Sequence, residues 1–260
     1  MKNLFSVFLT GWGDSSLERG DAKGAIQTLN QAISLNPDNH LAYFKRGSLR
    51  TELGDYRGAV EDFNQVIRIN PNEVTAYLNR GSAYLELKNY KAAVEDFNRV
   101  LGLNPNHLLA RCNRGLAYLK SGNYTTAIED FTEAVINNSN LGEAYINRGL
   151  AYALLEDYKK AIEDFTQVLQ LNPNSADAYY NRGLAYCQVE DVRGAIEDFT
   201  QTLRLSPNFA PAYTYRGLVR AALEDSRGAV DDLHKAANLF LEQGNIDSYQ
   251  KTLTAIREIE

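Results

Sequence analysis

The amino-acid sequence predicts an all-α solenoid of antiparallel helix hairpins, and two periodic features carry that prediction. Six glycines recur at an interval of 34 residues, each preceded by an arginine: Gly47, Gly81, Gly115, Gly149, Gly183 and Gly217. Asn-Pro or Ser-Pro pairs keep the same interval and begin at Asn36, Asn70, Asn104, Asn172 and Ser206. A fixed period of this length is typical of stacked two-helix units, none of which can bury its apolar side alone.

One 34-residue unit shows how the two helices arise. Residues 74–87 carry Tyr77 and Tyr84 among apolar positions spaced three and four apart, which predicts a first helix. Residues 90–103 repeat that spacing around Phe97 and predict a second helix. The Asn-Pro pair that follows ends the second helix, because proline cannot continue a helix and disfavours helical geometry in the residue before it.

Polar residues and glycines mark the turn between the two helices. The N-cap position of the second helix is held by Asp55, Asn89, Asn123, Asp157, Asp191 and Asp225. Gly54 and Gly122 stand one residue earlier in two of the units. They predict a left-handed cap at the end of the first helix, since glycine adopts that conformation without steric cost.

Small and aromatic residues form columns that are expected to build the core. The glycine column faces an alanine column at Ala59, Ala93, Ala127, Ala161, Ala195 and Ala229. Glycine inside a helix costs roughly 0.5–1 kcal/mol relative to alanine, so its repeated use there implies close helix packing. An aromatic column fills the space between the layers: Phe63, Phe97, Phe131, Phe165 and Phe199.

This pattern resembles the tetratricopeptide repeat. In one unit the matching residues are Tyr145, Gly149, Tyr152, Ala161, Phe165 and Pro173. The resemblance covers nearly the whole chain. It implies a right-handed superhelix in which the first helix of each hairpin lines a concave groove, and it implies a binding scaffold rather than an enzyme.

The predicted division has seven repeats and a closing helix. The repeats are 6–39, 40–73, 74–107, 108–141, 142–175, 176–209 and 210–243, followed by a capping helix at 244–260. The first repeat is degenerate, since Gly13 keeps the interval but Trp12 replaces the arginine. The apolar stripe of the last helix is expected to cover the last hairpin, with docking of a partner as the alternative.

Composition limits the classes of function. The net charge is −6 with no basic block, which disfavours binding to nucleic acid or to an anionic membrane. Cys112 and Cys187 have neither disulfide nor metal-site spacing, and no apolar stretch approaches the length of a membrane span. A cytoplasmic location is expected, although the short apolar run at residues 4–9 leaves a signal peptide open.

Asparagines supply the most specific candidate for binding. Asn79, Asn113, Asn147 and Asn181 precede the arginine in four successive repeats. The resemblance implies that this position faces the groove. A side-chain amide offers a donor and an acceptor together, which matches one peptide unit of an extended chain. The alternative is that these amides bond to neighbouring helix backbone and serve only the fold.

Apolar residues at two further groove positions are expected to select side chains of the bound peptide. They are Phe44, Leu78, Ile146 and Tyr180 at one position, and Leu116, Leu150 and Leu184 at the other. Glu52, Glu86, Glu143 and Asp177 add negative charge near the edges. A segment with apolar anchors and some basic residues fits best. The alternative is that the apolar residues only pack the inner side of the array.

The arginine column has aspartates as its natural partners. Arg46, Arg80, Arg114, Arg148, Arg182 and Arg216 are each followed 16 residues later by Asp62, Asp96, Asp130, Asp164, Asp198 or Asp232. We expect a ladder of ion pairs that sets the register of the helices, each worth at most about 1 kcal/mol if exposed. The alternative is that the arginines bind an acidic ligand.

The sequence therefore predicts a non-catalytic scaffold that binds a protein or peptide partner in its groove. No catalytic motif, phosphate loop or metal-ligand spacing is present in the sequence, so no cofactor is expected. The second hypothesis is a structural spacer that self-associates, or a regulatory fragment of a larger protein. Light scattering that shows mass rising with concentration, without ligand, distinguishes the second hypothesis from the first.

Overall fold

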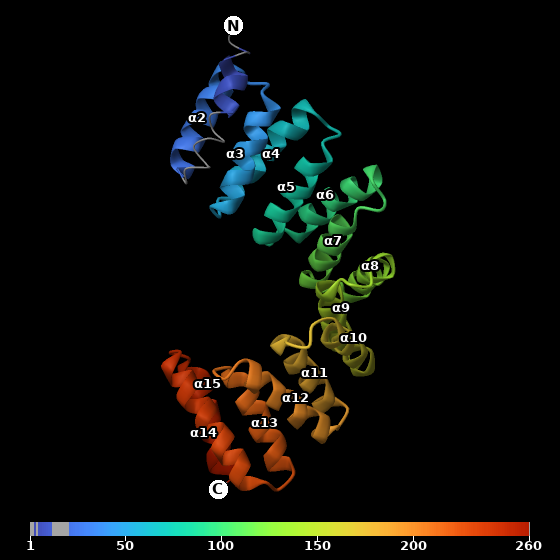
Figure 1. Cartoon of the computed structure of the whole chain (residues 1–260), viewed down its shortest axis with the longest axis vertical. Helices are drawn as coiled ribbons and strands as arrows, with labels where there is room; N and C mark the ends of the chain where they lie inside the picture. The colour runs from blue at the N-terminus through green and yellow to red at the C-terminus, as the bar shows by residue number, and fades with distance from the viewer. Residues whose placement is uncertain (1–2, 4, 12–20, 260) are drawn as a thin grey trace. The chain divides into compact units, whose positions relative to one another are not determined.

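Helices account for most of the chain outside short turns (Figure 1). The computed structural model describes residues 3, 5–11 and 21–259, and within these residues there is no strand. The predicted all-α class and the fold of stacked helix hairpins are confirmed. Trp12 and Gly13, on which the degenerate first repeat was predicted, lie outside the described residues.

The chain divides into two units, Met1–Asp130 and Phe131–Glu260, with the boundary inside α8. In the first unit, residues 5–11 are helical. They are followed by α2 (Ala22–Leu35), α3 (His40–Glu52), α4 (Tyr56–Ile69), α5 (Val74–Glu86), α6 (Tyr90–Leu103), α7 (Leu108–Lys120) and the start of α8 (Tyr124–Asn137). In the second they are α9 (Gly142–Leu154), α10 (Tyr158–Leu171), α11 (Ala176–Gln188), α12 (Val192–Leu205), α13 (Ala210–Ala222), α14 (Ser226–Glu242) and α15 (Ile246–Ile259).

The first helices of successive hairpins contact one another within each unit. These neighbours are α3 with α5 and α5 with α7 in the first unit, and α9 with α11, α11 with α13 and α13 with α15 in the second. Among the described residues no such contact joins the successive second helices α4 and α6, or α10, α12 and α14. The second helices therefore fan apart, and the first helices lie on the concave side of each unit.

The turns inside the hairpins follow the predicted cap chemistry. After α3, the N–H of Gly54 bonds to the carbonyl of Thr51, and the N–H of Asp55 bonds to the carbonyl of Arg50. Gly54 has a φ of 78° and Gly122 a φ of 85°, so both predicted left-handed caps are confirmed. The Asp55 carboxylate then accepts a hydrogen bond from the N–H of Gly58 and caps α4.

Four hairpins make the same left-handed turn without glycine. Lys88, Glu156, Glu190 and Glu224 have φ values between 58° and 62°. A side chain at such a φ crowds the following carbonyl and costs about 1–2 kcal/mol. Glycine was therefore a sufficient sequence signal for this cap but not a necessary one.

We expect Glu156→Gly to stabilise the protein by about 0.5–1 kcal/mol. Glycine removes the steric strain of the left-handed conformation, and its greater conformational freedom in the unfolded chain offsets only part of that gain. Glu190→Gly and Glu224→Gly should behave alike. Urea denaturation monitored by circular dichroism measures the change. Gly122→Ala is the reverse control and should destabilise. Equal stability of wild type and all three glycine variants would contradict the assignment of strain.

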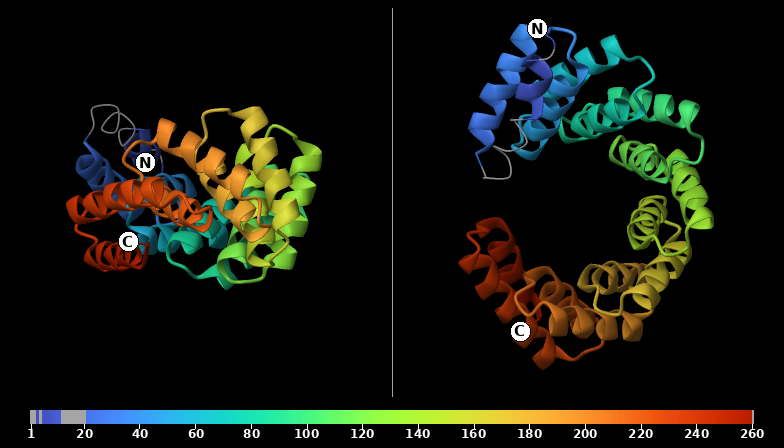
Figure 2. Two further views of the ribbon diagram at one scale, coloured as in Figure 1. Left: turned by 90° about the horizontal axis from the view of Figure 1, so that it is seen from below. Right: turned by 45° about the horizontal axis from the view of Figure 1, so that its top comes forward.

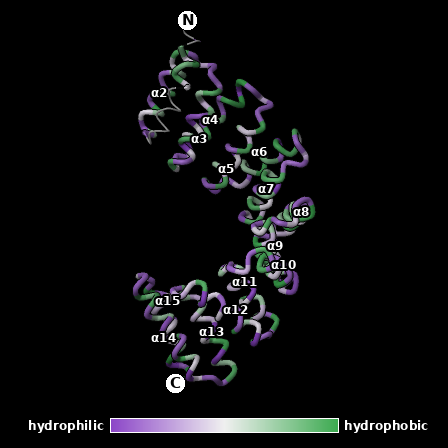
Figure 3. Tube along the Cα trace, viewed as in Figure 1, coloured by the Kyte–Doolittle hydropathy of each residue, from purple (hydrophilic) through white to green (hydrophobic). Residues whose placement is uncertain are grey.

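In four of the hairpins the core is a phenylalanine that packs against a glycine of the facing helix. The rings of Phe63, Phe97, Phe131, Phe165 and Phe199 are all 0% exposed. A Cβ added to Gly81 would lie 2.7 Å from Cε1 of Phe97, and one added to Gly149 would lie 2.9 Å from that atom of Phe165. In these hairpins glycine is thus required by the close approach of the ring. Figure 3 shows the matching alternation of apolar and polar residues along the helices.

The helix α14 is longer than its counterparts, with 17 residues against 14 in α12 and α10. Its last turns pack Leu239 and Phe240 against Tyr249 of α15. Figure 2 shows these last helices, in red, at the C-terminal end of the ribbon. Thr252 and Ile256 of α15 are also buried, whereas Ile246 is exposed. The closing helix thus covers the last hairpin through the middle of its apolar stripe and not through its start.

Candidate peptide-binding face

Every arginine of the column is paired with its aspartate across the hairpin. In the second unit, Nε of Arg148 donates to Oδ2 of Asp164 at 2.9 Å, and Nη2 donates to Oδ1 at 2.7 Å. The same two-point pairing joins Arg46 to Asp62, Arg80 to Asp96, Arg114 to Asp130, Arg182 to Asp198 and Arg216 to Asp232. The expected ladder is therefore present within the units.

A third bond, which the sequence reasoning missed, ties each arginine to the preceding hairpin. Nη1 of Arg148 donates to Oγ1 of Thr132 on α8 at 3.1 Å. The equivalent acceptors are Asn30, Asn64, Asn98, Thr166 and Thr200, each 16 residues before its arginine. These acceptors, asparagines in the earlier repeats and threonines in the later ones, keep the 34-residue interval. That interval is the feature of the sequence from which the third bond could have been predicted.

The aspartates are buried, so the interaction energy expected for exposed ion pairs does not apply to them. The Asp164 side chain is 4% exposed and the Arg148 side chain 15%. Burial raises the pKa of Asp96, Asp164 and Asp198, although the paired arginines oppose that shift. Hydrogen bonds to the carboxylates raise the pKa of Arg80, Arg148 and Arg182. The cost of desolvating both groups therefore offsets much of the attraction within each buried pair.

The bonding of the arginines favours the structural reading over ligand binding. Each guanidinium engages both neighbouring second helices, and five of them also lie over a tyrosine three residues earlier at 5.4–5.7 Å from the ring centroid: Arg46, Arg80, Arg148, Arg182 and Arg216. In the remaining repeat Arg111 replaces that tyrosine and donates to the carbonyl of Pro105. Glu163, which precedes Asp164 in the sequence, is exposed although the aspartate is buried.

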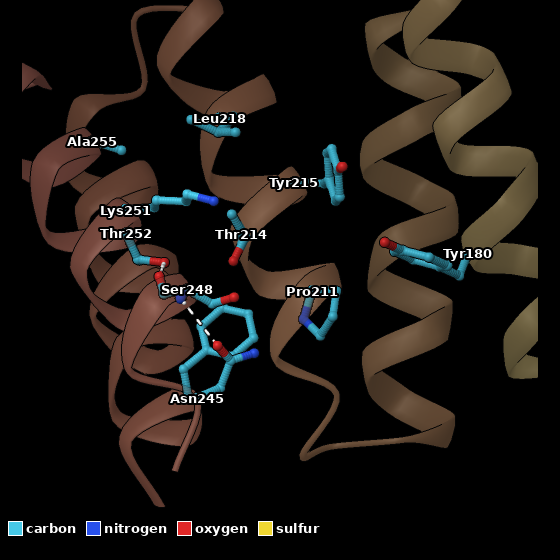
Figure 4. Close-up of a pocket in the computed structure, with 11 residues that line it drawn as sticks. Tyr180, Pro211, Thr214, Tyr215, Leu218, Asn245, Ser248, Lys251, Thr252 and Ala255 are labelled. Carbon is cyan, nitrogen blue, oxygen red and sulfur yellow. Dashed lines mark hydrogen bonds between the residues drawn. The ribbon is translucent and has the colours of Figure 1, made fainter. Parts of the chain in front are cut away.

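A pocket of about 480 Å³ on the concave side of the second unit shows which residues of a first helix face outward (Figure 4). Four residues of α13 line it, the later three lying three, four and seven residues after the first: Pro211, Thr214, Tyr215 and Leu218. We call these four positions, together with the positions 34, 68, 102 and more residues earlier that correspond to them in the preceding repeats, the inner face. Tyr180 of α11 belongs to the inner face and also lines the pocket.

The predicted asparagines occupy the third inner-face position in each unit. Asn79 on α5 and Asn113 on α7 belong to the first unit, and Asn147 on α9 and Asn181 on α11 to the second. All four side chains belong to half-buried residues. Asn79 and Asn147 make no hydrogen bond within the described part of the chain, so their amides are free to bind.

The other two asparagines are partly engaged. Nδ2 of Asn113 lies 3.5 Å from Oγ of Ser82, at the limit for a hydrogen bond. Nδ2 of Asn181 donates to the carbonyl of Asp177 in its own helix at 2.8 Å. The structural alternative thus applies to the donor of Asn181, whose side-chain oxygen stays available.

The apolar inner-face residues pack partly into the core. Phe44 meets Phe63 edge-on with centroids 5.9 Å apart, and Ile146 packs against Val168 and Ala178. The other predicted residues are also half-buried: Leu78, Leu116, Leu150, Tyr180 and Leu184. One side of each of these side chains packs into the core, and the other side stays accessible to solvent.

The helix α15 contributes an inner face that the sequence reasoning missed. It lines the pocket with Ser248, Lys251, Thr252 and Ala255, the same spacing as in α13 but 37 residues later. The three additional residues match the three by which α14 exceeds α12 in length. The change of interval from 34 to 37 hid the correspondence between α15 and the first helices of the hairpins.

The described residues hold neither a metal-ligand cluster nor a membrane-spanning helix. Among residues 3, 5–11 and 21–259, no three His, Cys, Asp or Glu side chains gather as metal ligands. No described helix is long and apolar enough to cross a membrane.

Family models match most of the chain. Models described as tetratricopeptide repeat match residues 74–107, 142–175 and 176–209 and residues 109–135, and a TPR repeat model matches residues 13–50 and 47–88. The chain belongs to the tetratricopeptide repeat (TPR) family. No curated protein sequence matches the chain significantly.

Solved TPR structures share the fold. A TPR protein from Parabacteroides merdae is 22% identical, with 95% of this chain and 98% of that chain aligned at a TM-score of 0.73. MamA from Desulfovibrio magneticus is 25% identical, with 65% and 96% aligned at a TM-score of 0.62. YrrB, described as a TPR protein with an unusual peptide-binding site, is 23% identical, with 71% of this chain and 95% of that chain aligned at a TM-score of 0.60.

Proposed function

We propose that this TPR protein is a non-catalytic scaffold that holds extended peptide segments on the inner faces of its two units. The observation that carries the proposal is the asparagine at one inner-face position of four consecutive first helices. Two of these amides have no hydrogen-bond partner among the described residues, and all four keep an oxygen that can accept one.

The chemistry of the inner face suits a peptide backbone. An asparagine amide can donate to a peptide carbonyl and accept from a peptide N–H, so it recognises the main chain without regard to sequence. The accessible sides of Leu150, Tyr180 and Leu184 in the second unit supply apolar contacts that discriminate among side chains. Main-chain bonds thus supply affinity, and the apolar contacts supply selectivity.

Double asparagine variants test the proposal in each unit. Peptides selected from a random display library on the wild-type protein serve as probes. We expect Asn79→Ala with Asn113→Ala, or Asn147→Ala with Asn181→Ala, to weaken the selected peptides about tenfold, because each lost hydrogen bond is worth about 0.5–1.5 kcal/mol. Fluorescence polarisation measures the affinity, and urea denaturation measures the stability.

The matched control changes two asparagines in exposed inter-repeat turns. Asn106→Ala with Asn174→Ala removes the same chemical groups away from the inner face and should leave peptide affinity unchanged. A loss of stability in the inner-face variants as large as their loss of binding would show that the asparagines serve only the fold.

A further inference from the structure

A second pocket of the second unit, of about 460 Å³, lies away from the inner face. It is lined by Tyr179 and Arg182 of α11 and by residues of α12 between positions 196 and 201. Arg182 stands between the second helices α10 and α12, because it bonds to Thr166 of one and to Asp198 of the other. None of the lining residues belongs to the inner face, so this pocket is separate from the pocket that α13 and α15 line.

The lining of this outer pocket has one uncompensated charge, and it is negative. Arg182 and Asp198 neutralise each other through two hydrogen bonds of 2.7 and 2.8 Å. The carboxylate of Glu197 is exposed and has no hydrogen-bond or ion-pair partner within the described part of the chain. The hydroxyl of Tyr179 has no partner there either and can accept a hydrogen bond. A cation that donates hydrogen bonds therefore complements the lining.

The first unit holds a guanidinium of its own at the equivalent place. Arg99 stands three repeats before Gln201. Tyr77 stands three repeats before Tyr179. Cζ of Arg99 lies 5.9 Å from the centroid of the Tyr77 ring, and Cζ of the column arginine Arg80 lies 5.5 Å from the same centroid. A tyrosine at this position thus accommodates a second guanidinium. In the second unit the residue is glutamine, and the place of that guanidinium is part of the outer pocket.

We propose that the outer pocket binds the arginine side chain of a partner protein, with its guanidinium over the Tyr179 ring and Glu197 as its counter-charge. The aliphatic stem of the arginine packs along Ile196, another lining residue. Arginine suits the site better than lysine, because a planar guanidinium stacks on an aromatic face and still has donors for a carboxylate and a hydroxyl. The site uses none of the four asparagines.

A second copy of the site is expected one repeat earlier. The residue type at every lining position recurs 34 residues before it, including Tyr145, Arg148, Glu163 and Gln167. The first helices of these two repeats, α9 and α11, contact each other, and packed helices lie about 8–10 Å apart. An extended chain covers that distance in about three residues. A partner segment with two arginines three residues apart can therefore engage both copies.

The probe is a fluorescein-labelled, amidated peptide, Gly-Arg-Gly-Gly-Arg-Gly, and its matched control carries citrulline, the neutral isostere, in place of both arginines. Fluorescence polarisation with the full chain measures both affinities. Nuclear magnetic resonance locates the binding through the backbone amide signals of α12. We expect the arginine peptide to bind saturably and the citrulline peptide to bind at least about tenfold more weakly, because it lacks the cation.

Two pairs of glutamine variants test the pocket from the side of the protein. Gln167→Arg with Gln201→Arg should fill both copies as Arg99 fills the equivalent place, and should weaken the arginine peptide about tenfold. Gln170→Arg with Gln250→Arg adds the same charge at exposed positions outside the lining and should preserve most of the affinity. Urea denaturation checks that all four variants stay folded.

Arg99→Gln makes the opposite test, because it empties the place over Tyr77 in the first unit. It should add a site for the arginine peptide there, seen as new shifts of the amide signals around Tyr77. Asn147→Ala with Asn181→Ala should leave the affinity for the arginine peptide unchanged. This proposal and the asparagine proposal therefore fail separately.

Three results would overturn the assignment. The first is equal affinity for the arginine and citrulline peptides. The second is an equal loss of affinity in the two pairs of glutamine variants, because the peptide would then respond only to the overall charge of the protein. The third is the absence of a new site in Arg99→Gln, because the tyrosine would then not select a guanidinium.

Discussion

Arg148→Leu is expected to destabilise the surrounding repeats by about 3–5 kcal/mol, the usual cost of removing one member of a buried ion pair. The substitution leaves the carboxylate of Asp164, which is 4% exposed, without its two charge-assisted hydrogen bonds. It also removes the bond to Thr132 that joins α9 to the preceding second helix. Urea denaturation gives the loss, and hydrogen exchange locates it around α9 and α10.

Two further variants separate the cost of a lone buried charge from the worth of the pair. Arg148→Leu combined with Asp164→Leu should restore most of the stability or exceed the wild type, since replacing both partners by apolar groups is often neutral or stabilising by about 1–4 kcal/mol. Arg68→Leu breaks an exposed pair with Asp38 and should cost at most about 1 kcal/mol. Equal losses for Arg148→Leu and Arg68→Leu would contradict this account.

Phe97→Ala is expected to cost about 3–5 kcal/mol, through lost burial and the cavity left behind. The ring is 0% exposed and packs with Val100, Leu101 and Ala110. Its edge approaches Gly81 so closely that no Cβ fits there. Urea denaturation measures the loss of stability. A cost below about 1 kcal/mol would show that the neighbouring layers collapse into the space.

The contact between ring and glycine makes a second, coupled test. Gly81→Ala alone should destabilise by about 1–3 kcal/mol through overpacking, but in a Phe97→Ala background it should be harmless or stabilising. Gly102→Ala is the matched control, because a Cβ added there meets nothing within 4 Å. The control should gain a few tenths of a kcal/mol or more from helix propensity.

The sequence was sufficient for the features that depend on local chemistry. Three kinds of residue have direct local consequences: an Asp or Asn before each second helix, glycine at two turns, and proline after five of the second helices. The helices begin and end where those residues predict. The Arg–Asp pairs were also predictable, because a constant separation of 16 residues places both partners across the hairpin at every repeat. The repeat boundaries themselves remain a prediction.

Features that depend on the three-dimensional context escaped the sequence reasoning. Nothing local distinguishes Glu156, at a φ of 61°, from a glutamate in the last turn of a helix. The burial of Asp164 follows from the packing of α9 on α10 and not from its neighbours in sequence. The inner face of α15 was missed because three additional residues in α14 break the interval on which the reasoning relied. The binding role of the asparagines stays a proposal.

The three-way arginine links bear on how arrays of this kind change length. Each arginine reaches an acceptor 16 residues before it and an aspartate 16 residues after it, and both asparagine and threonine serve as the acceptor. If 34 residues are excised, such as 142–175, the next arginine meets Thr132 where it met Thr166, and the set of links closes again. Gene duplication and deletion can therefore lengthen or shorten the array in whole repeats without leaving a buried charge unpaired.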